Sequence, residues 1–302
     1  MVVPFAFAWS EFFQQVVFGL SIGSVYGSLA LAIVLIYRTT RVVNFAQGEM
    51  AMFTTFICWS LMTNHGLSFW PAFFVTLGAA FVLGVAVERI VIRPFEHASH
   101  LALILVTIAL FVIFNGLAAW IWTPEQRAFL GPFSAKPFIV GGVAISRQDV
   151  GVLAVTLLTV AILWAFFRFT KLGLAMRAAA VGPGASQLMG VRVQWMYALG
   201  WGFATVLGAV SGMMVAPSVF LSPGMMQIVL IYAFAAAVLG GIESPVGAIV
   251  GGLLLGLGTT LIGAYIPFVS SDLDVPIAFT ILVLVLLFRP AGLFGRVVVR
   301  RV

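Results

Sequence analysis

The sequence predicts an all-α polytopic membrane protein with about eight or nine transmembrane helices. Of the 302 residues, 63% are hydrophobic and only 8% are charged, whereas soluble domains carry about 25% charged residues. The apolar residues form runs of about 20, the length that an α-helix needs to span a bilayer, and not the short alternating segments of a membrane β-barrel. The whole chain, 1–302, is therefore expected to be a single transmembrane domain.

The membrane helices are predicted from the apolar segments, taken in chain order. These segments are 12–37, 43–63, 70–92, 101–122, 150–169, 195–217, 226–242, 245–266 and 274–288. The segments 43–63 and 226–242 are interrupted or short, so one or both are expected to be broken or re-entrant helices. Non-helical backbone at membrane depth is tolerated where protein or a water-filled cavity satisfies it, so such breaks mark the expected transport pathway.

Basic residues set the expected orientation. Of the 15 Lys and Arg residues, all but Arg127, Lys136 and Arg147 fall on one side of the membrane if the N-terminus is outside. Because Lys and Arg are enriched in cytoplasmic loops, we expect the N-terminus outside and the C-terminus inside. The main outer loop is then about 123–149, and Asp272 also lies outside. The net charge of +6 is explained by these segment ends and does not indicate nucleic-acid binding.

The segment 168–192 differs from the rest of the chain. It is rich in small residues, it carries several basic residues, and Gly182, Pro183 and Gly184 interrupt it. The predicted orientation places it in the cytoplasm. A membrane protein that keeps such a basic loop between its spans is expected to present it to a cytoplasmic partner.

Few polar residues fall within the predicted spans, and each one has an energetic cost there. Asn44, Gln47 and Glu49 cluster in the interrupted segment. In one interpretation they belong to a broken helix beside the pathway, with amides facing a polar substrate. In the other, a helix starts near the cytoplasmic interface, Asn44 caps it, and Glu49 occupies a favourable N-terminal position. Asn115 is expected to donate an interhelical hydrogen bond or to line the pathway.

Glycines at spacings of four indicate close helix packing. These glycines are Gly19, Gly23 and Gly27; Gly208 and Gly212; Gly247 and Gly251; and Gly252 and Gly256. Such rows let helix backbones approach one another, and we expect them to serve packing within the chain. A dimer face or a pore lining is the alternative.

Several sequence motifs that mark nucleotide-binding, metal-binding or catalytic sites are missing. The sequence has no phosphate-binding Gly-x-x-x-x-Gly-Lys-Ser/Thr, no zinc-binding His-Glu-x-x-His and no nucleophile Gly-x-Ser-x-Gly. The single Cys58 and the histidines His65, His97 and His100 are not spaced like a metal site. We therefore predict no catalytic residue and no metal site. A membrane pathway without an energy source of its own indicates that a partner drives it.

Seven short motifs, spread along the chain, together resemble those of a known protein family. They are 41–50 (RVVNFAQGEM), 88–94 (ERIVIRP), 170–180 (TKLGLAMRAAA), 188–191 (LMGV), 237–241 (AVLGG), 247–256 (GAIVGGLLLG) and 287–295 (LFRPAGLFG). In this order they resemble the permease subunits of branched-chain amino acid ABC importers, and the resemblance covers about 12–296.

The resemblance implies partners and a location. It implies a second, homologous permease subunit, two cytoplasmic ATPase subunits that bind ATP and Mg²⁺, and a periplasmic substrate-binding protein. The chain itself would then hold no cofactor, and it would lie in the bacterial cytoplasmic (inner) membrane. The segment 168–192 resembles the loop that docks on an ATPase. Its candidate residues are Lys171, Met176, Arg177, Pro183, Leu188, Met189 and Gly190. The candidate pathway residues are Asn44, Gln47, Glu49 and Asn115.

The chain departs from the family pattern at three places. Gln47 stands where the family often has His, and Glu243 where many members have Gly. Val181 and Gly182 replace an acidic pair that usually lies in the docking loop. Without these acids, docking is expected to depend on shape and on apolar contacts around Met176, Leu188 and Met189, and to weaken little with added salt.

The expected function is transport of branched-chain or related amino acids, driven by partner ATPases. A self-sufficient channel or secondary transporter for a small polar solute, such as urea or an amide, is the alternative. That alternative needs coupling carboxylates at membrane depth, and Glu49 is the candidate. An intramembrane enzyme would need acid and base residues that face each other at depth, and the sequence offers no such pair.

Overall fold

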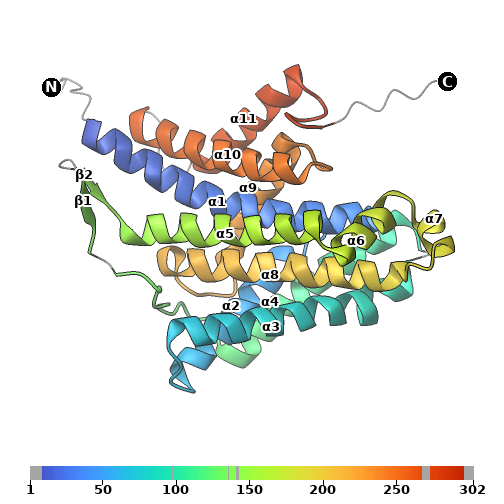
Figure 1. Cartoon of the computed structure of the whole chain (residues 1–302). Coiled ribbons are helices and arrows are strands. Elements are labelled where there is room, and N and C mark those ends of the chain that lie inside the picture. The colour runs from blue at the N-terminus through green and yellow to red at the C-terminus, as the bar shows by residue number, and fades with distance from the viewer. Residues whose placement is uncertain (1–8, 97, 135, 141–142, 267–272, 296–302) are drawn as a thin grey trace.

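The protein is a bundle of helices with one short β-hairpin, as described by a computed structural model for residues 9–96, 98–134, 136–140, 143–266 and 273–295 (Figure 1). Asp272, His97 and the basic residues beyond 295 lie outside these ranges. The helices are α1 (Trp9–Thr40), α2 (Gln47–Thr63), α3 (Phe69–Val87), α4 (His100–Trp122), α5 (Arg147–Phe169), α6 (Lys171–Val181), α7 (Pro183–Leu188), α8 (Val193–Val219), α9 (Met225–Gly240), α10 (Pro245–Tyr265) and α11 (Asp274–Phe288). The hairpin pairs β1 (Phe138–Val140) with β2 (Val143–Ile145).

A helix lies at each predicted apolar segment, and the all-helical fold is confirmed. Within the described ranges, six helices are long and apolar enough to cross a membrane: α1, α3 with the turns that extend it to Phe95, α4, α5, α8 and α10. The helices α2, α9 and α11 have 17, 16 and 15 residues. They rise only about 22–26 Å, which is less than the hydrocarbon thickness of about 30 Å. The prediction of eight or nine crossings therefore stays a prediction.

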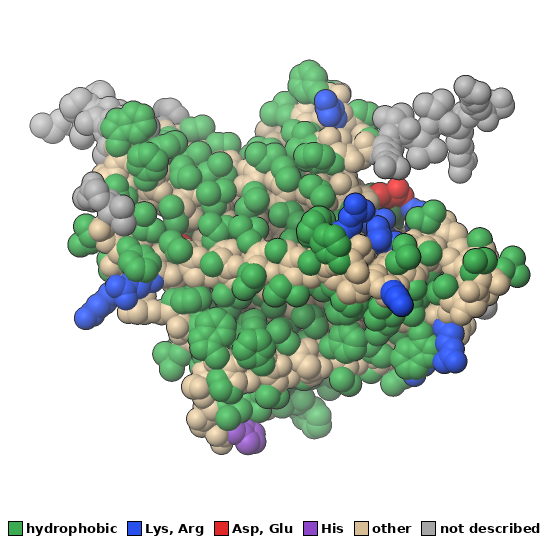
Figure 2. All heavy atoms as spheres, in the orientation of Figure 1, with side chains coloured by type: hydrophobic (Ala, Val, Ile, Leu, Met, Phe, Trp, Pro, Cys, Tyr) green, Lys and Arg blue, Asp and Glu red, His purple; other side chains and the backbone are tan. Residues whose placement is uncertain are grey.

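The helices α1 and α8 form the centre of the bundle. In each, 83% of the most apolar stretch is buried, compared with 28% for α4 and α5. The outer helices leave large apolar side chains such as Trp120, Leu158 and Ile162 exposed. A bilayer can cover these side chains without a free-energy penalty, since lipid tails are as apolar as the residues themselves. Apolar side chains cover most of the face shown in Figure 2.

The glycine rows pack helices of this chain against one another, as the sequence predicts. A Cβ on Gly252 of α10 would lie 2.2 Å from the backbone nitrogen of Gly27 on α1, and one on Gly256 would lie 2.3 Å from the Cα of Gly23. A Cβ on Gly251 would lie 2.3 Å from the carbonyl oxygen of Ala236 on α9. Only glycine allows these backbones to approach so closely.

The hairpin and the pair α6–α7 lie at opposite ends of the bundle (Figure 1). The 23-residue helix α5 connects the two ends, and it rises about 34 Å, more than the hydrocarbon thickness. In Figure 2 most of the visible Lys and Arg side chains gather at the end that carries α6 and α7. The loop around 123–149 and the segment 168–192 are therefore at opposite ends of the bundle.

Candidate functional site

The chain is broken between α1 and α2. Residues 41–46 are not helical, and Arg41 has a positive φ of 57°. The backbone turn that follows is held by Asn44, whose Oδ1 accepts a hydrogen bond from the Ala46 amide at 3.0 Å. Ala46, and not Asn44, is the residue that precedes the first turn of α2. The interpretation of Asn44 as the helix cap is therefore wrong.

The helix α2 begins deep within the bundle. Gln47 Nε2 donates a hydrogen bond to the Ala204 carbonyl of α8 at 2.9 Å, and Asn44 Nδ2 donates to Gln47 Oε1 at 3.2 Å. Ala204 follows the start of α8 by three turns, which is a rise of about 16 Å. The helix α2 therefore begins well inside the bundle and not level with the start of α8, and the prediction of a broken helix stays a prediction.

The amides of Asn44 and Gln47 do not face open space. Both residues are 0% exposed, and their hydrogen bonds are made within the protein. Close contact with α8 is possible because Gly208 faces Gln47: a Cβ there would lie 2.8 Å from Gln47 Nε2. In this conformation Asn44 and Gln47 hold the turn before α2 in place, and their assignment to the pathway stays a prediction.

Glu49 and Asn115 form a second polar pair, which connects three parts of the chain. Asn115 Nδ2 donates to Glu49 Oε2 at 3.2 Å and to the Pro223 carbonyl at 2.9 Å. Gln227, the exposed third residue of α9, also interacts with the Glu49 carboxylate. The prediction that Asn115 donates between helices is confirmed.

The carboxylate of Glu49 is only 1% exposed, and its Oε1 is buried without a well-formed hydrogen bond. The two ion pairs found among the described residues are Arg41 with Glu243, and Arg93 with Glu88, so neither involves Glu49. Buried polar atoms in proteins are nearly always hydrogen-bonded, and an exception needs an explanation. Asn115 is partly exposed and Gln227 is exposed, so the polar group around Glu49 extends to the surface of the bundle.

Sequence reasoning missed Pro223 and Gln227 as neighbours of Glu49. The non-helical residues 220–224 separate α8 from α9, and Leu221 pairs with Arg127 of the loop 123–149 through two backbone hydrogen bonds of 2.9 Å. The adjacent Pro223 and Gly224 were the available signal for this second break.

The segment 168–192 folds into two short helices with defined ends. Thr170 begins α6, and its Oγ1 accepts a hydrogen bond from the Gly173 amide at 3.0 Å. Pro183 occupies the first position of α7, where a missing amide proton has no consequence. Gly190 ends α7 with a φ of 82°, and the Val191 amide donates to the Ser186 carbonyl at 2.9 Å. This is a Schellman motif, which needs glycine at that position.

The two faces of the α6–α7 pair differ. On the inner face, Met176 is 4% exposed and packs with Val193 and Met196 of α8. On the outer face, Leu188 and Met189 are 91% and 84% exposed. Met176 therefore anchors the element to the bundle, whereas Leu188 and Met189 form its exposed apolar surface; docking around these three residues stays a prediction. Lys171 is exposed, whereas Arg177 is half-buried and lies beside Met176 in a pocket.

The chain is similar to membrane proteins of a known transport family. Residues 15–288 match the family described as "Branched-chain amino acid transport system / permease component". The chain belongs to this family. It is 32% identical to the high-affinity branched-chain amino acid transport system permease protein BraD of Pseudomonas aeruginosa, over 97% of this chain and 98% of that protein. It is 27% identical to the permease protein LivH of Escherichia coli, over 96% and 98%.

A further relative comes from an archaeon. The permease is 28% identical to a protein of Methanocaldococcus jannaschii named as a probable branched-chain amino acid transport permease protein, over 88% of this chain and 87% of that protein. Permease components of ABC transporters are membrane subunits and not enzymes. The permease is accordingly a membrane transport protein of this family.

Proposed function

We propose that the permease forms part of the translocation pathway of an ABC importer for branched-chain or related amino acids. Its family and the names of its relatives support this substrate class. Two cytoplasmic ATPase subunits, which bind ATP and Mg²⁺, would drive transport, and a periplasmic binding protein would deliver the substrate. A second, homologous permease would complete the pathway.

The α6–α7 pair carries this proposal. It is well-formed, it is anchored to α8 through Met176, and it presents Leu188 and Met189 at its outer surface. Apolar side chains that protrude this far are unfavourable in water unless a partner covers them. A partner ATPase at this end of the bundle would cover them and would transmit its movement to α8.

We propose that the N-terminus is outside and the C-terminus inside, in the cytoplasmic membrane of a bacterium. The location of basic residues at the α6–α7 end supports this orientation. The test uses Gln187→Cys and Glu125→Cys with a membrane-impermeant thiol reagent on intact cells. We expect labelling of residue 125 alone; Cys58 is 0% exposed and supplies the unlabelled background. Labelling of residue 187 alone would reverse the orientation.

The pathway is proposed to pass beside Glu49 and Asn115. The buried Oε1 of Glu49, which lacks a well-formed hydrogen bond, and the partial exposure of Asn115 support this position. A carboxylate at this site is suited to the ammonium group of an amino acid, and opening of the bundle would expose it.

Replacement of Glu49 with Gln tests this role. Gln has nearly the same shape and still accepts the bond from Asn115, so we expect unchanged yield and thermal stability. Substrate uptake by the reconstituted transporter should fall about tenfold or more, because the ammonium group would lose its charged partner. The control Glu125→Gln removes the same charge from the outer loop and should transport normally. Equal uptake by both variants would exclude Glu49 from the pathway.

The whole function is tested by reconstitution in liposomes. We expect leucine uptake only when the second permease, both ATPases, ATP and the loaded binding protein are present. Uptake of urea or an amide by this chain alone, without ATP, would support the alternative of a self-sufficient channel or transporter. Calorimetry of the binding protein with candidate amino acids would identify the substrate within the class.

A further inference from the structure

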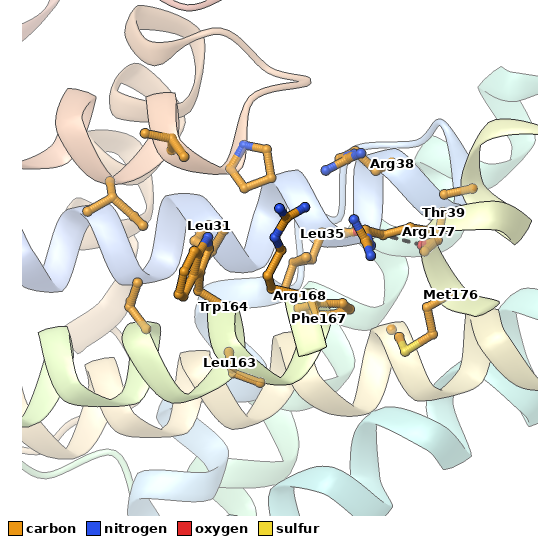
Figure 3. Close-up of a pocket in the computed structure, with 16 residues that line it drawn as sticks. Leu31, Leu35, Arg38, Thr39, Leu163, Trp164, Phe167, Arg168, Met176 and Arg177 are labelled. Atoms are coloured by element: carbon orange, nitrogen blue, oxygen red, sulfur yellow. Dashed lines mark hydrogen bonds between the residues drawn. The ribbon is translucent and has the colours of Figure 1, made fainter. Parts of the chain in front are cut away.

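A pocket of about 250 Å³, here called the charged pocket, lies between the end of α1, the turns that follow α3, and the first halves of α4 and α8. Its floor is buried and includes Val42, Leu103 and Trp201, whereas Arg41 and Glu96 at its rim are exposed. The pocket beside α6 in Figure 3 differs, since apolar side chains and three arginines line it and no Asp or Glu is among its described lining residues. The charged pocket carries both signs of charge.

A π-helical turn, Glu88–Ile92, brings two opposite charges together in the charged pocket. The Arg93 amide donates to the Glu88 carbonyl, which is a bond between residues five apart. Side chains three or four apart share a face of an α-helix, whereas a bond of this kind places residues five apart over one another. Arg93 Nη2 lies 3.4 Å from Glu88 Oε2, farther than the about 2.7–2.9 Å of a well-formed charge-assisted hydrogen bond. The two charges therefore lie side by side without a close bond between them.

Buried hydrogen-bond donors without a partner also belong to this pocket. Trp201 is 1% exposed, and its Nε1 has no hydrogen-bond partner within the described ranges. The same holds for Arg93 Nε. Buried polar atoms are nearly always paired, and these two groups can only donate. Since both side chains line the pocket, it favours a ligand that accepts hydrogen bonds.

The charges that line the pocket balance one another. Arg41 and Arg93 are matched by Glu88 and Glu96, and Arg41 also pairs with Glu243, which lies outside the pocket. A ligand with a net charge of either sign would meet like charges here, which repel it. An amino acid carries its ammonium and carboxylate on one carbon, so it can contact Glu88 and Arg93 at once. The apolar floor suits a short apolar side chain, and a volume of about 250 Å³ suits a small molecule.

The charged pocket lies between the polar residues of α2 and the end of the bundle that carries α6 and α7. The helix α8 runs inward from that end (Figure 1). Trp201, in the pocket floor, comes three residues before Ala204, which accepts the hydrogen bond from Gln47. Arg93 Nη2 donates to the carbonyl of Gln194, the second residue of α8, at 3.1 Å. The pocket is therefore nearer to the α6–α7 end than Gln47 is.

We infer that the charged pocket binds a zwitterionic amino acid with a short apolar side chain, its carboxylate at Arg93 and its ammonium at Glu88. The inference rests on the proposed function and adds a second site to it. This site is the last one that transported substrate occupies before it leaves the permease at the α6–α7 end. Such a site has to release its ligand, so we expect weak binding, with a Kd of about 1 mM.

Saturation-transfer NMR on the purified full-length permease, without binding protein or ATPases, measures this binding. We expect a saturable signal from leucine. Two analogues test the need for both charges: 4-methylpentanoate lacks the ammonium group of leucine, and 3-methylbutylamine lacks its carboxylate. Each should compete with leucine about tenfold less well or worse, because each loses one charge-assisted contact. Competition by either analogue as strong as that of valine would overturn the inference.

Two variants locate the binding, each with a matched control. Glu88→Gln with Arg93→Gln removes both charges at once and should weaken leucine binding about tenfold or more, whereas Glu11→Gln with Lys136→Gln removes one charge of each sign outside the pocket. Leu103→Phe fills the floor without changing any charge and should also weaken binding. Its control, Leu105→Phe, enlarges an exposed residue of the same helix outside the pocket. Both controls should bind leucine as wild type does.

Equal binding by the pocket variants and their controls would overturn the inference. No saturable binding by wild type up to about 10 mM leucine would also overturn it, and would mean that water fills the pocket. Neither result would count against the proposed function, which uptake by the reconstituted importer tests separately. If that uptake failed while the pocket still bound leucine, the binding site would stand and its role in transport would be overturned.

Discussion

Replacement of Leu188 and Met189 with Asp is expected to abolish ATP-driven uptake. The two side chains are almost fully exposed at the tip of the α6–α7 pair, and burying a side chain of this size stabilises a contact by about 1.5–3 kcal/mol. Losing both contacts and placing two carboxylates in an apolar interface should weaken ATPase binding more than about 100-fold. Co-purification of the ATPases and uptake in proteoliposomes both measure this loss.

The control for this variant is Gln187→Asp, which adds a charge to the same short helix at an exposed polar position. It should retain ATPase binding, which would separate the loss of apolar contact from the addition of charge. Wild-type binding should weaken little with added salt, because apolar contact is not screened. Normal co-purification of the double Asp variant, or strong weakening of the wild-type complex by salt, would contradict docking through these residues.

Substitution of Gly252 by Ala is expected to destabilise the permease severely. The added Cβ would lie 2.2 Å from the Gly27 nitrogen, and the obstacle is backbone and not a flexible side chain. The helices α1 and α10 would have to separate, and overpacking of this kind typically costs about 1–3 kcal/mol or more. The temperature of half-inactivation in detergent and the yield of monodisperse protein measure the effect.

Gly78→Ala is the matched control for this variant. Gly78 is also in a membrane helix, but a Cβ there meets nothing within 4 Å. Because Ala favours the helix over Gly, this variant should be as stable as wild type or slightly more stable. A fall in stability shared by both variants would mean that any methyl group in these helices is harmful, and it would contradict the packing argument.

Much of the fold was predictable because the bilayer constrains the chain locally. A membrane helix must be apolar over about 20 residues, and its ends carry the charges, so the positions of the helices follow from composition along the chain. The ends of α7 could also be predicted from the local sequence, because Pro183 and Gly190 favour a helix start and a helix end through the conformation of their own backbone. The rows of glycines likewise predicted that helix backbones approach closely, although they did not predict which helix packs against which.

The pairing of polar groups was not predictable from the sequence. Gln47 bonds to a carbonyl 157 residues away, and Glu49 to an amide 66 residues away. Spacing on one helix gives the face of a residue but not the neighbour that packs there. For this reason the sequence left two interpretations of Asn44 open, a broken helix and a helix cap, and Pro223 and Gln227 were missed as neighbours of Glu49.

By itself, the sequence determined the helical membrane fold, the family and the position of the α6–α7 pair, because hydropathy, Gly and Pro residues and family motifs can be read directly along the chain. Only the tertiary structure decided how the polar side chains are used. It buried Met176, left Leu188 and Met189 exposed, and brought Arg38, Arg168 and Arg177 to one pocket. These outcomes depend on which helix faces lie together, and packing sets those faces through contacts between residues distant in the sequence.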